Sequence, residues 1–119
     1  MTCRDIYKAA LPLMGEVASE SNAERAEELL TSVIYCLLPV DRLKKKSVGE
    51  TAIPAPKLST SLDDVWPLDS CFLPCAAHYL AAYMLGSEDP DLSAMLYARA
   101  EALKRIISDQ IPFVIEKIA

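Results

Sequence analysis

The stretch Cys75-Ala76-Ala77-His78-Tyr79-Leu80-Ala81-Ala82-Tyr83-Met84-Leu85 decides the fold of this chain. Every residue in it except His78 is apolar, and alanine and leucine, which favour helix, supply much of its mass. A helix that is apolar on all sides must also be covered on all sides. We therefore expect this helix at the centre of an all-α domain, with other helices around it and a neighbouring subunit on any side left open.

Two helices are predicted before this central one. The first spans Cys3–Met14, with Thr2 and Asp5 close to a capping box at its start and Gly15 as a natural stop. The second begins after Ser21 or Asn22, and its apolar stripe is Ala26, Leu29, Leu30, Val33, Ile34 and Leu37. Pro39 should end or bend the second helix, so that Asp41–Lys46 is a continuation or a short extra turn.

One helix is predicted after the central one. Gly86 ends the central helix, and Asp89 with Pro90 begins the next, which runs to about Gln110. The short turn makes these two helices antiparallel. The fold class is thus four main helices in an antiparallel bundle-like core. The last helix should bury one apolar stripe, made of Leu92, Met95, Leu96, Leu103, Ile106 and Ile107.

A break of 22 residues, Ser47–Leu68, interrupts this helical pattern. It has no helical period, and a segment of this length inside a compact domain is usually functional or disordered. A small hairpin between Val48–Ile53 and Lys57–Leu62 is compatible with its sequence. We expect Leu62–Asp69 to be anchored by a packed Trp66, and the more polar Ser47–Ser61 to be an arm for a neighbour.

The whole chain, residues 1–119, is short enough for a single domain. Residues 112–119 form an apolar tail, which we expect to pack on the helices or to dock on a partner. No apolar run is long enough to span a membrane, and no signal peptide is visible, so we expect a cytoplasmic chain with reduced cysteines.

The formal charge is −5, and the basic residues gather at Arg42 and Lys44-Lys45-Lys46. An acidic chain of this kind is a poor candidate for specific nucleic-acid binding. The lysines complement the dipole at a helix end, or contact an acidic patch such as Glu24–Glu28 on another subunit.

Cys71, Cys75 and His78 are spaced at i, i+4 and i+7, so on an unbroken helix they would share one face. Cysteine and histidine are the residue types that bind zinc. Pro74 interrupts that face, and buried cysteines are common in ordinary cores, so packing is the preferred interpretation. His78 has no neighbouring nucleophile in a triad order, so we expect no catalytic residue.

Asp63 and Asp64, with Asp69, could form a carboxylate cluster for a divalent cation. Their spacing differs from that of a calcium loop, and helix capping accounts for Asp69. We expect no metal and no cofactor.

Several packing motifs together resemble a known family: Tyr7–Glu16, the helix end Leu37-Leu38-Pro39, Leu62-Asp63-Asp64 before Pro67-Leu68, and Leu85–Leu92. The chain is similar to the all-helical head–tail connector (adaptor) proteins of tailed phages and prophages, over about residues 5–110. The resemblance implies a non-enzymatic virion assembly protein that forms a ring and bridges the portal to the tail. It also implies a location in the bacterial cytoplasm during assembly, and then in the virion.

The resemblance also implies that the break and the tail contact neighbouring subunits, the portal or tail-completion proteins. The candidate interface residues are Trp66, Asp63, Asp64, Lys57, Lys44, Lys45, Phe113 and Ile115. Trp66 is the candidate aromatic anchor. The alternative is a small helical regulatory or ligand-binding module, in which tyrosines of the central helix line a pocket. The least favoured interpretation is a small enzyme that uses His78 and a cysteine.

Overall fold

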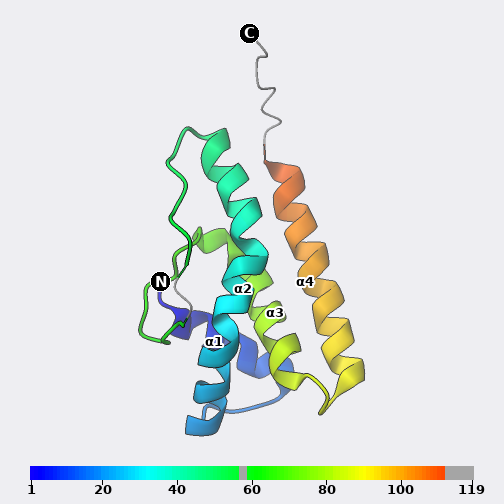
Figure 1. Cartoon of the computed structure of the whole chain (residues 1–119). Helices are drawn as coiled ribbons and strands as arrows, with labels where there is room; N and C mark the ends of the chain where they lie inside the picture. Colours follow the sequence, from blue (N-terminus) through cyan, green and yellow to red (C-terminus); the bar gives the residue numbers. More distant parts are fainter. Residues whose placement is uncertain (57–58, 112–119) are drawn as a thin grey trace.

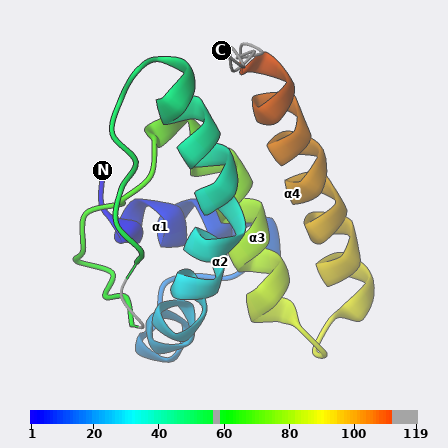
Figure 2. The same ribbon diagram turned by 45° about the horizontal axis from the view of Figure 1, so that its top comes forward.

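The computed structural model describes residues 1–56 and 59–111, and within them it contains four α-helices and one short 3₁₀ helix. They follow in the order α1 (Cys3–Met14), α2 (Glu20–Ser47), η1 (Ser70–Phe72), α3 (Leu73–Leu85) and α4 (Pro90–Gln110). Helices α2, α3 and α4 run up, down and up, while α1 crosses behind them (Figures 1 and 2). The all-α class predicted from the sequence is confirmed.

Helix α3 is the centre of this fold, as its composition predicts. It packs against α1, α2 and α4, and nine of its thirteen residues are buried. Tyr79 and Leu80 are completely buried, and the alanines let the neighbouring helices approach closely. The chain therefore covers its own apolar helix, and α3 leaves little apolar surface for another subunit.

The ends of α1 and α4 are set by local sequence. Thr2 and Asp5 form the predicted capping box at the start of α1. Gly15 ends the helix in the left-handed conformation, at φ 69°, which costs glycine little. At α4, the side chain of Asp89 accepts a hydrogen bond from the Leu92 N–H, and Pro90 follows it. These predicted boundaries are confirmed.

Helix α2 differs from its prediction at its start. It begins at Glu20, capped by Ser19, which is earlier than expected. At the other end it continues through Pro39 to Ser47, so Asp41–Lys46 is the continuation that the sequence left open and not a separate turn. Pro39 lies on the exposed side of the helix, where water can satisfy the carbonyl that loses its N–H partner. The buried Leu37 and Leu38 beside it keep the helix on the core.

The apolar stripe predicted for α4 is partly wrong. Leu96 is buried, and Leu92, Leu103 and Ile107 pack against the core. Met95 and Ile106, however, are 45% and 53% exposed. They are exposed because α4 packs chiefly against α3 and to a lesser extent against α2, which leaves another side of the helix uncovered.

The segment between α2 and η1 forms no strand in its described part, so the hairpin compatible with the sequence is not present there. A single isolated bridge pairs Thr2 with Val65. The second arm of the hairpin would have included residues 57–58, which lie outside the described residues, as does the predicted tail at 112–119. No helix in the described part is long and apolar enough to cross a membrane.

Candidate functional site

The start of the chain holds the second half of the irregular segment through its backbone. The N–H groups of Cys3 and Arg4, in the first turn of α1, donate to the carbonyl oxygens of Asp64 and Leu62, each at 2.9 Å. In return, the Trp66 N–H donates to the Met1 carbonyl oxygen at 3.0 Å. A helix cannot satisfy its own first N–H groups, so this segment completes the start of α1.

Helix α2 holds the same segment through three polar side chains spaced four residues apart. Glu27 accepts from the Leu62 N–H at 2.9 Å, and the Thr31 hydroxyl lies 2.7 Å from that of Thr60. The Tyr35 hydroxyl donates to the Pro56 carbonyl oxygen at 3.2 Å. Residues at this spacing share one face of a helix. We call Glu27, Thr31 and Tyr35 the polar face of α2.

The end of the segment is fixed by Asp41, which is completely buried near the C-terminal end of α2. Its carboxylate accepts from the Asp69 N–H at 2.9 Å and from the Lys45 ammonium at 2.6 Å. Lys44 pairs with the Asp69 carboxylate at 3.2 Å. The pKa of Asp69 is lowered, chiefly by the hydrogen bond from the Cys71 N–H and further by Lys44.

Trp66 is packed inside the chain, as its sequence context predicts. It is 4% exposed, and its indole N–H donates to the Asp69 carbonyl oxygen at 3.3 Å. A buried indole stabilises the segment from within. It is not accessible to a partner in this conformation, so the structure gives no support to Trp66 as an exposed interface anchor.

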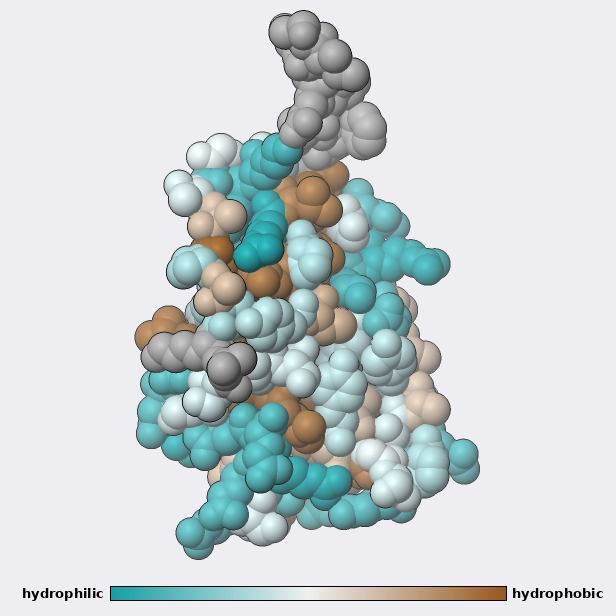
Figure 3. Space-filling model, in the orientation of Figure 1, coloured by the Kyte–Doolittle hydropathy of each residue, from teal (hydrophilic) through white to brown (hydrophobic). Residues whose placement is uncertain are grey.

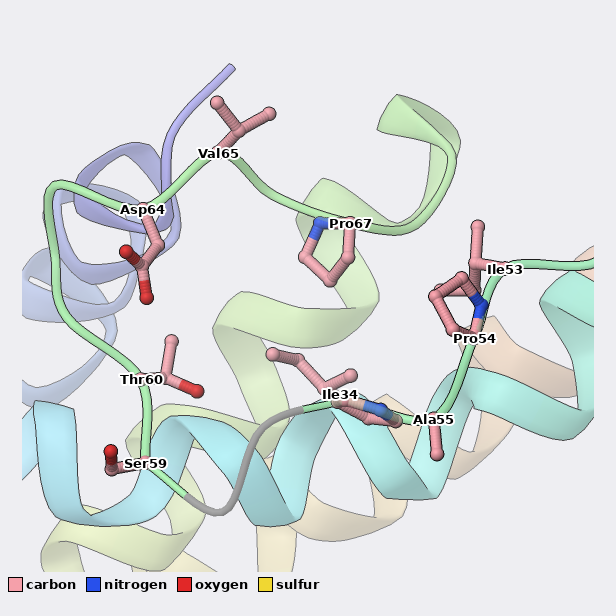
Figure 4. A pocket seen from close by; sticks show the side chains of 10 residues that line it. Ile34, Ile53, Pro54, Ala55, Ser59, Thr60, Asp64, Val65 and Pro67 are labelled. Atoms are coloured by element: carbon pink, nitrogen blue, oxygen red, sulfur yellow. The ribbon is translucent and has the colours of Figure 1, made fainter.

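The anchored segment encloses a pocket of about 450 Å³ against α2, which we call the loop pocket. Its lining residues are Ile34, Ile53, Pro54, Ala55, Pro56, Ser59, Thr60, Asp64, Val65 and Pro67. Figure 4 shows Ile34 on the helix at its base, Pro67 above it, and Thr60 and Asp64 at one side. The side chain of Val65 points away, and it is 74% exposed.

The loop pocket is largely apolar, with few polar groups. The Asp64 carboxylate accepts from the Ser61 N–H at 2.9 Å through one oxygen. Its other oxygen has no hydrogen-bond partner among the described residues. Such a lining suits an aliphatic group that carries, or lies beside, a cation.

A second polar cluster lies where α3 meets α4. The rings of Tyr79, Tyr83 and Tyr97 have centroids 5.7–6.5 Å apart. The Tyr79 hydroxyl donates to Glu101, which also pairs with Lys104 at 3.4 Å. Burial raises the pKa of Tyr83 to about 12 and that of Tyr79 further. These tyrosines pack on one another, and none of them lines the loop pocket.

Cys71, Cys75 and His78 do not come together as metal ligands. Cys75 is buried and its thiol donates to the Ala100 carbonyl oxygen, whereas Cys71 is exposed. Burial raises the pKa of Cys75 to about 12, so its thiol stays protonated at neutral pH. His78 bonds through Nδ1 to the Pro74 carbonyl oxygen of its own helix at 2.7 Å. No cluster of potential metal ligands occurs within the described ranges.

The remaining predicted interface residues divide into three groups. Asp63 is exposed and pairs with Arg4 at 2.9 Å. Lys44 and Lys45 are engaged in the ion pairs with Asp69 and Asp41 described above. Lys57, Phe113 and Ile115 lie outside the described residues.

Sequence reasoning missed two parts of this region. The polar face of α2 carries a signal, because Glu27, Thr31 and Tyr35 are spaced at i, i+4 and i+8. The lining of the loop pocket carries no sequence signal. Ile34 lies far from the other lining residues in the sequence, and only the tertiary fold brings them together.

Comparison of the chain with protein-family models, with curated proteins and with solved structures finds no match in any of the three.

Proposed function

We propose that this protein is a non-enzymatic assembly subunit that associates head to tail with copies of itself. From the sequence resemblance, we propose in particular a head–tail connector (adaptor) of a tailed phage or prophage. Its partners would be a ring of its own copies together with the portal or tail-completion proteins.

The observation that carries this proposal is the position of two apolar surfaces on opposite sides of the molecule. One is the loop pocket. The other consists of the apolar Met95, Ala98, Ala102 and Ile106 with the charged Arg99 among them, all exposed on α4. We call these five residues the α4 outer face. The irregular segment and α4 occupy opposite edges of the fold (Figure 2). Head-to-tail assembly needs two different surfaces of this kind.

The front face is mixed in character, with hydrophilic side chains over much of it and hydrophobic ones in the upper half between α2 and α4 (Figure 3). Since the chain itself covers α3, no neighbouring subunit is required to bury that helix. Assembly would use the peripheral elements instead.

The test is the mass of the protein in solution. Light scattering coupled to size exclusion should show association that increases with concentration, or that begins when a portal ring is added. A strict monomer at every accessible concentration, with no binding to a portal ring, would overturn the proposal.

A second candidate is the small helical ligand-binding module. It is favoured by the volume of the loop pocket, because about 450 Å³ is within the range of small-molecule sites. A thermal-shift screen with small apolar amines tests it. Stabilisation that Asp64→Asn abolishes would favour this function, and an empty screen would count against it.

A further inference from the structure

We propose that the loop pocket receives the α4 outer face of the next copy of this chain, with Ile106 entering the pocket and Arg99 pairing with Asp64. This inference rests on the proposed head-to-tail assembly and names the two surfaces that meet.

The α4 outer face has the composition of a docking helix. Met95, Ala98, Ala102 and Ile106 recur at the spacing of one helix face, and Met95 and Ile106 are about half exposed. The two alanines leave room for a partner's backbone to approach. Within the described part of the chain nothing covers this face, so it is free to pack against another molecule.

The loop pocket is complementary to this face in shape and in polarity. A cavity of about 450 Å³ lined by Ile34, Ile53 and several prolines can take an aliphatic side chain such as that of Ile106. Proline has no backbone N–H group, so an apolar side chain that enters the pocket leaves no proline donor without a hydrogen-bond partner.

The charges of Arg99 and Asp64 favour a second copy of this chain as the occupant of the loop pocket. Arg99 lies within the α4 outer face and is exposed, and it has no ion pair with another described residue. Asp64 lines the pocket, with one carboxylate oxygen left without a partner in the described part. The two positions on α4, 99 and 106, are about 10 Å apart along the helix axis, close enough for one docked helix to place both residues at the pocket.

The contact is heterologous, because the pocket and the α4 outer face are different surfaces. Each copy therefore keeps one free surface after it binds the other, which leads to a ring or to an open filament.

The experiment is a charge exchange measured by sedimentation velocity at low salt. Arg99→Glu and Asp64→Lys should each raise the apparent dissociation constant of self-association by about tenfold or more, because each places like charges together. Mixing the two variants in equal amounts should restore association. In the mixture, the glutamate introduced at position 99 of one variant faces the lysine introduced at position 64 of the other, and the second contact is the wild-type pair.

Three controls make the result decisive. Arg42→Glu makes the same charge change as Arg99→Glu on an exposed part of α2 outside both surfaces, and it should leave association unchanged. Ile106→Asp should weaken association as strongly as Arg99→Glu does. The variants at Arg42, Arg99 and Ile106 should remain folded by circular dichroism, because these side chains are exposed. Asp64 is half-buried, so the fold of Asp64→Lys is checked by the same measurement, and restored association in the mixture shows that its pocket is intact.

The outcomes separate this pairing from the proposed function. If the wild type associates and the charge variants do not change it, or if the mixture is not restored, the pairing is wrong while assembly stands. If the wild type does not associate, either alone or with a portal ring, assembly itself is wrong.

Discussion

Helix α3 and the segment from residue 48 to Asp69 are held in place by different forces. Helix α3 is fixed mainly by burial, with nine apolar side chains enclosed by three other helices. The segment has no regular structure in its described part and is fixed at a few points. These are individual hydrogen bonds to residues 1–4, to the polar face of α2 and to Asp41, together with a few buried side chains such as Trp66. The first kind of stabilisation is distributed, whereas the second depends on single groups.

This difference predicts how each region responds to substitution. A buried helix should lose stability in proportion to the apolar volume removed. The segment should be sensitive at a few positions and tolerant elsewhere.

The largest effect is expected inside the segment. Trp66→Ala removes a buried aromatic side chain and should lower the free energy of unfolding by about 3–5 kcal/mol, measured by urea denaturation. Deletion of Val48–Thr51, whose side chains are all exposed, should cost less. Equal tolerance of both changes would show that Trp66 does not anchor the segment.

A similar but somewhat smaller loss is expected in α3. Leu80→Ala should cost about 2–5 kcal/mol, because Leu80 is completely buried. The matched control is Leu43→Ala in α2, where the side chain is 54% exposed and the cost should stay below about 1 kcal/mol. Equal losses in the two variants would mean that α3 is not the centre of the core.

The third prediction concerns the buried carboxylate at the end of the segment. Asp41→Ala leaves the Asp69 N–H and the Lys45 ammonium without their acceptor, and it should cost about 2–3 kcal/mol in the same denaturation experiment. Asp41→Asn keeps an oxygen for the Asp69 N–H and should cost less. If Asn is as harmful as Ala, the ion pair with Lys45 is the dominant contribution.

The smallest effect at neutral pH comes from the buried thiols. Burial raises the pKa of Cys3 to about 11 and of Cys75 to about 12, above the ordinary value of 9.0. Their contribution to stability is therefore complete below about pH 9 and is lost as the pH rises toward 11 or 12, since the unfolded chain ionises first.

Urea midpoints between pH 7 and about 10.5 would measure this loss. Cys75→Ala should make the pH dependence above about pH 9 shallower, whatever its effect at neutral pH. A pH profile of Cys75→Ala identical to that of the wild type would show that the Cys75 thiol does not contribute to the loss of stability at high pH.

Much of the fold could be predicted from the sequence, because helices and their caps depend on residues close together in the chain. Thr2 with Asp5, Gly15, and Asp89 with Pro90 each mark a boundary that the structure confirms. Whether α2 ends or continues at Pro39 could not be decided in this way, since the outcome depends on which side of the helix faces water. The exposure of Met95 and Ile106 has the same origin, because it depends on how many neighbours surround α4.

The candidate site was predicted less well than the fold. The sequence indicates that the break matters and that Trp66 is packed, and the burial of Trp66 is confirmed. The loop pocket forms only when the fold brings Asp64 and Pro67 next to Ile34 and Pro54, and no local sequence pattern predicts these tertiary contacts.

The hydrogen bonds between residues 1–4 and the irregular segment also set the order in which parts of the chain can fold during synthesis. The first turn of α1 finds its backbone acceptors at Leu62 and Asp64, and Met1 accepts from Trp66. A chain that leaves the ribosome from its N-terminus must therefore be extended past residue 66 before α1 can be completed. Helix α1 is made before residues 62–66 but acquires its backbone partners only after them, and a nascent chain stopped at residue 56 should leave residues 1–4 accessible to protease.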